Sequence, residues 1–219
     1  MSETRERKLK VSRRPVANPL PRGGVRIAEA LKSLLEQKDF NAITTAQISR
    51  KSGVNEALIY KYFGDKRGLL HQVLRDYLDE YLGVMESELK GIKGTFNKLK
   101  KIIWSQMNLY GSKRVVAKIL LLEVRNYPGY YESETYNQVR RYSRIVKKTL
   151  EEGVNSGELR DDIPVASMRQ ILLGGVEHMC LPKIIFGHPF SPEQFTKEVC
   201  AVIFEGIANP RLRDKKKNK

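Results

Sequence analysis

The stretch GVNEALIYKYFGDKRGLL, residues 53–70, sets two tyrosines, a phenylalanine and three basic residues directly after a glycine. Gly53 can supply the left-handed backbone that ends a preceding helix. Asn55 is a favourable N-cap for a short helix that follows. The apolar Leu58 and Ile59 would face the core of such a helix pair. The residues left to face outward are Glu56, Ala57, Lys61 and Tyr62.

Two further helices are expected before this one. Apolar residues at the spacing of one helical face predict the first, which ends near Lys38; they are Ile27, Leu31, Leu34 and Leu35. For the second, Thr44 and Gln47 fit a capping box, in which each side chain bonds the backbone N–H of the other residue. Three short helices, the last two joined by a tight glycine turn, have the outline of a helix-turn-helix.

Residues 27–70 resemble the N-terminal domain of the tetracycline-repressor (TetR) family of bacterial transcription regulators. The family pattern is matched by Thr44, Ile48-Ser49, Ser52-Gly53-Val54, Ile59-Tyr60, Tyr62-Phe63 and Lys66. Ser49 and Ser52 stand where alanine is usual, and both are small enough to preserve the helix packing. The resemblance implies binding to DNA and about six further helices that form a ligand pocket and a dimer interface.

The second helix of a helix-turn-helix enters the major groove with its N-terminal residues foremost. Lys61 and Glu56 are therefore expected to face base edges, although Glu56 is equally explained as a first-turn acid that the helix dipole favours. The resemblance implies a phosphate contact for Tyr60, and Lys66 is expected to make another. The predicted DNA-contacting residues are Thr44, Thr45, Gln47, Asn55, Glu56, Ala57, Tyr60, Lys61, Tyr62 and Lys66.

The rest of the chain also has helical patterning without a clear strand signal. Helices are expected from residue 66 and at about 95–110, 113–126, 132–156, 165–181 and 192–208, with breaks at glycines and prolines that include Pro182. The predicted fold class is all-α with about nine helices. The predicted parts are a basic tail at 1–21, a helix-turn-helix unit at 22–68, a helical ligand-binding and dimerisation domain at 69–208, and a basic tail at 209–219.

The net charge of +15 lies mostly in the two ends of the chain. Residues 1–22 carry seven basic and two acidic residues, and residues 209–219 carry six basic residues and one acidic residue. Such tails either maintain solubility or attract a polyanion, such as nucleic acid or an acidic membrane surface. The charged N-terminus is unlike a secretory signal, no apolar run could span a membrane, and two cysteines suggest a reducing compartment. We therefore expect a cytoplasmic protein without a membrane partner.

The middle helices of the second domain supply candidates for a ligand pocket. The apolar candidates are Trp104, Met107, Leu109, Ile119, Leu122, Val176 and Met179, and the polar ones are Tyr110, Arg125 and His178. Such a lining suits a hydrophobic or amphipathic effector. Because this domain resembles that of family members that respond to fatty acyl compounds, an acyl thioester is the candidate. A metal site needs several converging ligands, so we expect a buried or pocket-lining His178 and no metal or cofactor.

Together these features predict a ligand-responsive transcriptional regulator, in the simplest case a repressor that a hydrophobic effector releases from a palindromic operator. We expect a homodimer built from the last two helices, with Val199 and Ile203 at the interface. An architectural DNA-binding protein without an effector remains an alternative. A helical enzyme is a weaker one, because no catalytic motif is present; clustering of Glu123, Arg125 and His178 would favour it. We expect no enzymatic activity.

Overall fold

The computed structural model describes residues 20–189 and 191–209. The α-helices in these ranges are α1 (Arg22–Leu35), α2 (Thr45–Ser52), α3 (Ala57–Phe63), α4 (Lys66–Lys90), α5 (Thr95–Ser112), α6 (Arg114–Lys118), α7 (Glu134–Asn155), α8 (Val165–Phe186) and α9 (Pro192–Ile207). Four helical turns connect some of them: η1 (Phe40–Ala42), η2 (Ile119–Glu123), η3 (Val124–Asn126) and η4 (Tyr130–Glu132). Within the described ranges the only β-structure is one isolated bridge, so the all-α fold class is confirmed. Almost all of both predicted basic tails lies outside the described residues.

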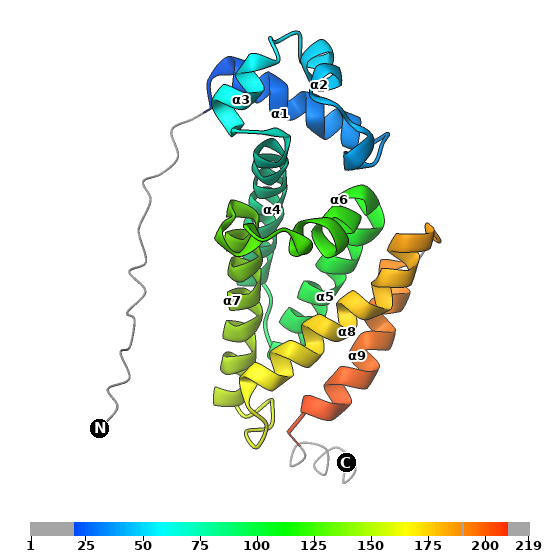
Figure 1. Cartoon of the computed structure of the whole chain (residues 1–219). Coiled ribbons are helices and arrows are strands. Elements are labelled where there is room, and N and C mark those ends of the chain that lie inside the picture. The colour runs from blue at the N-terminus through cyan, green and yellow to red at the C-terminus, as the bar shows by residue number, and fades with distance from the viewer. Residues whose placement is uncertain (1–19, 190, 210–219) are drawn as a thin grey trace, which may run out of the picture.

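The helices form a small unit and a larger body. Helices α1, α2 and α3 lie together at one end of the molecule, and α4 runs from this unit into a body that contains α5, α7, α8 and α9 (Figure 1). Helix α6 and the turns that follow it lie where the body meets the three-helix unit (Figure 1). None of the helices at 20–189 and 191–209 is long and apolar enough to cross a membrane.

Short-range contacts determine where α2 ends and α3 begins. The Thr44 hydroxyl accepts from the backbone N–H of Gln47 at 3.2 Å, and Gln47 Oε1 accepts from the backbone N–H of Thr44 at 3.1 Å, which confirms the capping box. Gly53 ends α2 with a φ of 63°. Asn55 Oδ1 accepts from the N–H of Ala57 at 2.8 Å. These caps satisfy backbone groups that helix ends leave unpaired, so the turn is fixed locally.

The junction between α3 and α4 is equally tight. Asp65 caps α4, because its Oδ1 accepts from the N–H of Gly68 at 2.6 Å. A Cβ atom at Gly68 would overlap the carbonyl oxygen of Phe63 at the end of α3. Only glycine therefore allows the two helices to approach this closely, and the close approach sets the direction in which α4 leaves the three-helix unit.

The buried apolar side chains form two clusters. The first holds the three-helix unit together around Ile27, Leu31 and Ile59, and it continues into the body at Ile119 and Val124. The second fills the body and joins α4, α5, α7, α8 and α9. Because η2 and η3 contribute side chains to the core of the three-helix unit, that unit is packed against the body and is not merely tethered to it through α4.

Two predicted helices have different boundaries in the structure. The segment expected as one helix at 113–126 is the short α6 followed by the π-helical turn η2 and the 3₁₀ turn η3. Helix α8 was expected to end at residue 181 but continues through Pro182 to Phe186, where Gly187 ends it with a φ of 77°. A proline inside a helix removes one backbone hydrogen bond, yet the helix continues past it, and Ile184 in this last turn is buried in the core of the body.

Candidate DNA-binding surface and ligand pocket

Side chains of α3 and of the start of α2 form the candidate DNA-binding surface. Thr44, Asn55, Ala57, Tyr60 and Lys61 are exposed, and Tyr60 has 52% of its surface accessible. The predicted residues Thr45, Gln47 and Glu56 are half-buried. A phenol and an ammonium group that face solvent are free to donate hydrogen bonds to phosphate or to base edges. The geometry is thus compatible with the predicted contacts, which remain predictions.

Tyr62 does not point outward as predicted. Its ring packs on the start of α1, where Cβ atoms built at Gly23 and Gly24 would lie 3.6 and 3.5 Å from ring carbons. The ring also meets Phe63 edge to face, with 6.3 Å between centroids. The outward assignment was wrong because α1 crosses α3 at this position and covers one side of the helix. The Tyr62 side chain therefore joins α3 to α1.

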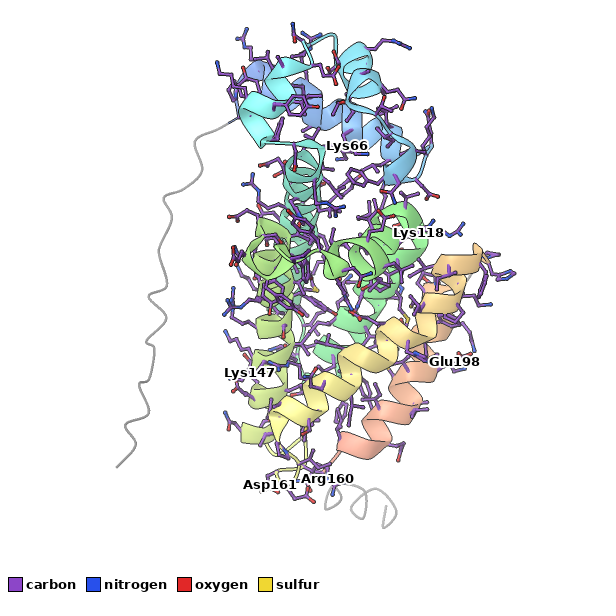
Figure 2. All side chains as sticks on the ribbon, viewed as in Figure 1. Lys66, Lys118, Lys147, Arg160, Asp161 and Glu198 are labelled. Atoms are coloured by element: carbon purple, nitrogen blue, oxygen red, sulfur yellow. The ribbon has the colours of Figure 1, made fainter. Side chains whose placement is uncertain are left out.

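Lys66 is engaged within the protein, which contradicts its prediction as a phosphate contact. Its ammonium donates to the carbonyl oxygens of Phe40 and Ile43 at 3.1 and 2.7 Å, and it lies 4.3 Å from the centroid of the Phe40 ring. Burial lowers the pKa of Lys66, and the neighbouring Arg67 adds to this effect. Figure 2 shows Lys66 where α4 meets the three-helix unit. The residue therefore closes the turn η1 against α4.

Arg26 is a basic residue that the sequence analysis did not select. Its side chain is exposed on α1, and a Cβ atom at Gly53 would lie 2.7 Å from its guanidinium. The guanidinium therefore lies beside the turn between α2 and α3. Only its charge could have drawn attention to it in the sequence, because its position depends on how α1 packs across the other two helices.

The body contains a cavity of about 260 Å³. Its walls come from α4, α5, α7 and α8 and from the turns η2 and η3. The aliphatic part of the lining consists of Leu78, Leu82, Leu109, Leu120, Val139 and Leu173, and the rest includes Tyr81, Gln106, Tyr110, Arg125, Gln138, Tyr142 and Glu177. An apolar cavity with a limited set of polar groups is the usual form of a small-molecule site.

Hydrogen bonds organise part of this polar lining. The Tyr142 hydroxyl donates to Gln106 Oε1 at 2.6 Å, and Gln106 Nε2 donates to the Tyr110 hydroxyl at 3.0 Å. Burial raises the pKa of both tyrosines well above the ordinary value, so they are neutral donors. Arg125 donates to both carboxylate oxygens of Glu177, at 2.9 and 2.7 Å. The cavity therefore presents neutral groups, one ion pair whose charges compensate each other, and the exposed Arg140.

Three of the ten candidates for the ligand pocket, Leu109, Tyr110 and Arg125, line this cavity. Met107 and Val176 lie fully buried in the core of the body, whereas Leu122 and Met179 pack at its edge. Trp104 faces a separate groove between α4 and α5 and donates from Nε1 to Glu193 at 3.1 Å. These five residues therefore do not line the cavity as predicted. Ile119, also proposed as wall material, is buried in the core of the three-helix unit.

His178 is exposed, so the prediction of a buried or pocket-lining histidine was wrong. Successive residues of a helix point about 100° apart, and because Glu177 faces the cavity, His178 faces solvent. His178 therefore does not join Arg125 in the cluster that an enzyme would have required. In the part of the chain that the structure describes, no group of three His, Cys, Asp or Glu residues could hold a metal ion.

The polar lining residues Tyr81, Gln106, Gln138 and Tyr142 were missed by the sequence analysis. They occupy positions of α4, α5 and α7 that face the interior, where an amphipathic pattern calls for apolar residues. Polar residues at interior positions were a usable signal, since buried polar groups require partners. Reading that signal requires the helix registers, which the sequence alone gives only approximately.

The outer face of α8 and α9 carries exposed apolar side chains. Ile171 and Val202 are 63% and 77% exposed, and Ile185 and Phe186 are exposed near the end of α8. Val199, in contrast, is buried in the core of the body, which contradicts its prediction as an interface residue. One side of α9, which includes Val199, therefore packs inside the subunit. Other apolar residues of the helix, such as Val202, face outward.

A three-helix unit with exposed tyrosine and lysine side chains, joined to a helical body that contains a cavity, defines the class of ligand-responsive DNA-binding regulators. Residues 27–73 match the family described as bacterial regulatory proteins, tetR family. Residues 74–206 match the C-terminal region of YsiA-like proteins. This chain belongs to the tetR family of bacterial transcription regulators. The predicted family is therefore confirmed.

Relatives agree with this assignment. The chain is 20% identical over 185 residues to the fatty acid metabolism regulator protein of Bacillus subtilis, which covers 84% of this chain and 95% of that protein. The crystal structure of FadR from Bacillus subtilis in complex with stearoyl-CoA aligns with a TM-score of 0.75 at 20% identity, over 84% of this chain and 98% of that one. A transcriptional regulator from Saccharomonospora viridis in complex with choline aligns with a TM-score of 0.71 at 18% identity, over 84% and 97% of the two chains. At these identities the structural likeness shows the fold.

Proposed function

We propose that this regulator is a repressor that binds a palindromic operator as a homodimer and dissociates when a small hydrophobic effector enters the cavity. The observation that carries the proposal is the cavity itself, which is lined in part by α4, the helix that follows directly after the three-helix unit. An architectural DNA-binding protein has no need for such a cavity. A protein of this kind acts on DNA in the cytoplasm, without an enzymatic step and without a membrane partner.

On the DNA side, we assign different roles to neighbouring residues. Tyr60 donates to phosphate and positions the protein, as do the amides at the start of α2, near Thr45, that the capping box of Thr44 and Gln47 leaves unbonded. Lys61 and Glu56 lie closer to the base edges and contribute sequence selectivity. The exposure of Tyr60 and Lys61 supports these roles. Lys66 is no longer part of the contact set, because its ammonium is bound to two carbonyl oxygens.

The homodimer is proposed to form through the outer face of α8 and α9. Ile171 and Val202 supply exposed apolar area on this face. Gly174 and Gly206 are exposed, and a Cβ atom at either would meet nothing within 4 Å. Glycine inside a helix costs about 0.5–1 kcal/mol relative to alanine, and packing within the subunit does not account for it here. Close approach of a second copy would, and the dimer would then present two recognition helices to half-sites about 34–36 Å apart.

The segment between α6 and η3 offers a route from the cavity to the DNA-binding surface. Leu120 and Arg125 line the cavity, whereas Ile119 and Val124 belong to the core of the three-helix unit. A π-helical turn inside a helix often marks a functional site. A ligand that displaces Leu120 or Arg125 would shift the neighbouring side chains that support α1. Binding would thereby favour a conformation with a different affinity for DNA.

An acyl thioester remains the proposed effector. FadR of Bacillus subtilis is known in complex with stearoyl-CoA. Because the two chains align over 98% of FadR, this complex supports a related ligand for the present protein. The cavity of about 260 Å³ is small for so long a chain. It shares Tyr81 and Leu109 with the groove between α4 and α5, whose volume is about 420 Å³. Movement of these two side chains would give an acyl chain the additional length it needs.

The test uses a DNA site that the protein itself selects from random sequence. Footprinting should reveal two compact half-sites, and titration with long-chain acyl thioesters should release the protein at micromolar concentrations. A footprint without half-sites, together with no release, would favour the architectural alternative. If half-sites are found but thioesters do not release the protein, the proposed repressor function stands and the proposed effector is wrong.

A further inference from the structure

Two buried polar atoms in the cavity have no partner in the protein. They are the hydroxyl of Tyr81, on α4, and the side-chain oxygen of Gln138, on α7; among the described residues neither has a hydrogen-bond partner. Buried polar groups are almost always hydrogen-bonded, because an unpaired one loses the free energy of its hydration. Both residues line the cavity, so a molecule inside it can supply the missing bonds.

The two unpaired atoms require different kinds of hydrogen-bonding group from a ligand. A tyrosine hydroxyl donates a proton, and an amide oxygen only accepts one. Among the other polar groups of the lining, Tyr142, Gln106 and Tyr110 bond one another in sequence. Tyr81 and Gln138 are the lining residues among those described whose buried polar atoms lack a partner. The unsatisfied pair therefore calls for a ligand with an acceptor for Tyr81 and an O–H or N–H donor for Gln138.

The charges around the cavity disfavour an anion. The charge of Arg125 is compensated by Glu177 through two hydrogen bonds. Arg140, the other cation in the lining, is exposed, where solvent screens its charge. A carboxylate could accept from Tyr81, but it has no proton for Gln138 and would lose hydration without gaining a counter-ion.

We propose that the cavity recognises an uncharged group that is both acceptor and donor through Tyr81 and Gln138, such as a hydroxyl or an amide like those in the pantetheine arm of a coenzyme A thioester, and that it discriminates against carboxylates. This inference rests on the proposed function only in placing the effector in this cavity. Tyr81 on α4 and Gln138 on α7 then determine the specificity of the cavity, and both residues line it.

Three probes of nearly equal shape separate the contributions. Octanamide carries an acceptor and a donor, 2-nonanone carries only an acceptor, and octanoate carries a negative charge at neutral pH. Calorimetric titration of the full-length protein should rank octanamide first, 2-nonanone second and octanoate last, with about tenfold between the first and the last. Equal affinity for octanamide and octanoate, or no binding of any probe, would overturn the proposal and leave water as the occupant.

Matched variants assign the groups to the residues. Tyr81→Phe should weaken octanamide and 2-nonanone by about five- to tenfold, and Gln138→Met should weaken octanamide alone. Tyr77→Phe is the control, because Tyr77 lies one turn earlier on α4 and outside this cavity. Since the Tyr81 hydroxyl is unpaired in the protein, Tyr81→Phe should not lower the melting temperature. Unchanged ligand affinity in Tyr81→Phe would overturn the assignment.

Measuring DNA binding in the same samples distinguishes a failure of this recognition proposal from a failure of the proposed function. If octanamide binds in the predicted order but the protein stays on its DNA site, the recognition chemistry stands and the ligand-response proposal fails. If the probes do not bind while acyl thioesters still release the DNA, the proposed function stands and the chemistry assigned to Tyr81 and Gln138 is wrong.

Discussion

At the scale of single residues, Lys61 and Lys66 lie only five positions apart in the sequence, yet one faces solvent and the other bonds within the protein. Lys61 is exposed on α3, whereas the Lys66 ammonium bonds the carbonyl oxygens of Phe40 and Ile43. A charge in solvent is available to a polyanion, and a charge committed to buried carbonyls contributes to stability instead. The two lysines therefore provide matched controls for each other.

Replacing Lys66 should affect folding more than DNA recognition. In Lys66→Met the two carbonyl oxygens lose their donor, which should lower the free energy of unfolding by about 1–3 kcal/mol. The salt dependence of DNA binding should keep its slope, because no phosphate contact is removed. Urea denaturation and DNA titrations at several salt concentrations measure both quantities. A flattened slope with unchanged stability would restore Lys66 as a phosphate contact.

Replacing Lys61 should give the reverse pattern. Lys61→Ala should leave stability unchanged and cost about 1–3 kcal/mol of binding free energy on the selected DNA site, if the ammonium bonds a base edge. Scrambled DNA should be bound almost as well as by the wild type. Equal weakening on both DNAs would instead make Lys61 a phosphate contact and would require a different orientation of α3 in the groove.

These residues also show which site features the sequence could predict. Thr44, Gln47, Gly53 and Asn55 were predictable because a cap depends on neighbours within a few positions. The positions of Tyr62 and His178 were not, because each depends on which side of a helix a distant element covers. The role of Lys66 depends on carbonyl groups more than twenty positions earlier in the chain, and no local pattern encodes such a pairing.

At the scale of elements, the junction of α3 and α4 links the DNA-binding surface to the body. The cap at Asp65 and the close approach at Gly68 fix the direction of α4. The element order was predictable, since periodicity and Gly or Pro breaks mark most helices. The irregular turns η2 and η3 were not, because the packing of Ile119 and Val124 against the three-helix unit determines them.

Two glycines of α4 should respond oppositely to the same substitution. In Gly68→Ala the new methyl group would overlap the Phe63 carbonyl, so the free energy of unfolding should fall by about 1–3 kcal/mol. Gly83 is exposed and a Cβ atom there would meet nothing within 4 Å. Gly83→Ala should therefore raise stability by about 0.5–1 kcal/mol. Thermal or urea unfolding tests the pair, and equal effects at the two positions would refute the close approach.

At the scale of the whole molecule, the proposed binding to two half-sites requires two copies of the chain. In the subunit, Val199 is buried and Val202 is exposed, so the two valines of α9 should behave differently. The double variant Ile171→Glu, Val202→Glu should fold, remain monomeric in light scattering and bind DNA weakly. Val199→Glu should lower subunit stability, because it buries a charge. A stable dimer in the double variant would place the interface elsewhere.

Occupancy of the cavity is expected to control DNA binding, and a variant that fills the cavity tests this coupling. Leu173 lines the cavity from α8 and packs against the core of the body, and Leu173→Phe should occupy part of the space without changing the core of the three-helix unit. Binding of a labelled DNA site is followed by fluorescence anisotropy while stearoyl-CoA is added to the wild type and to the variant. We predict equal DNA affinity without ligand, release of the wild type, and little or no release of the variant. Equal release of both proteins, or no release of the wild type, would show that the cavity does not control DNA binding in the proposed way.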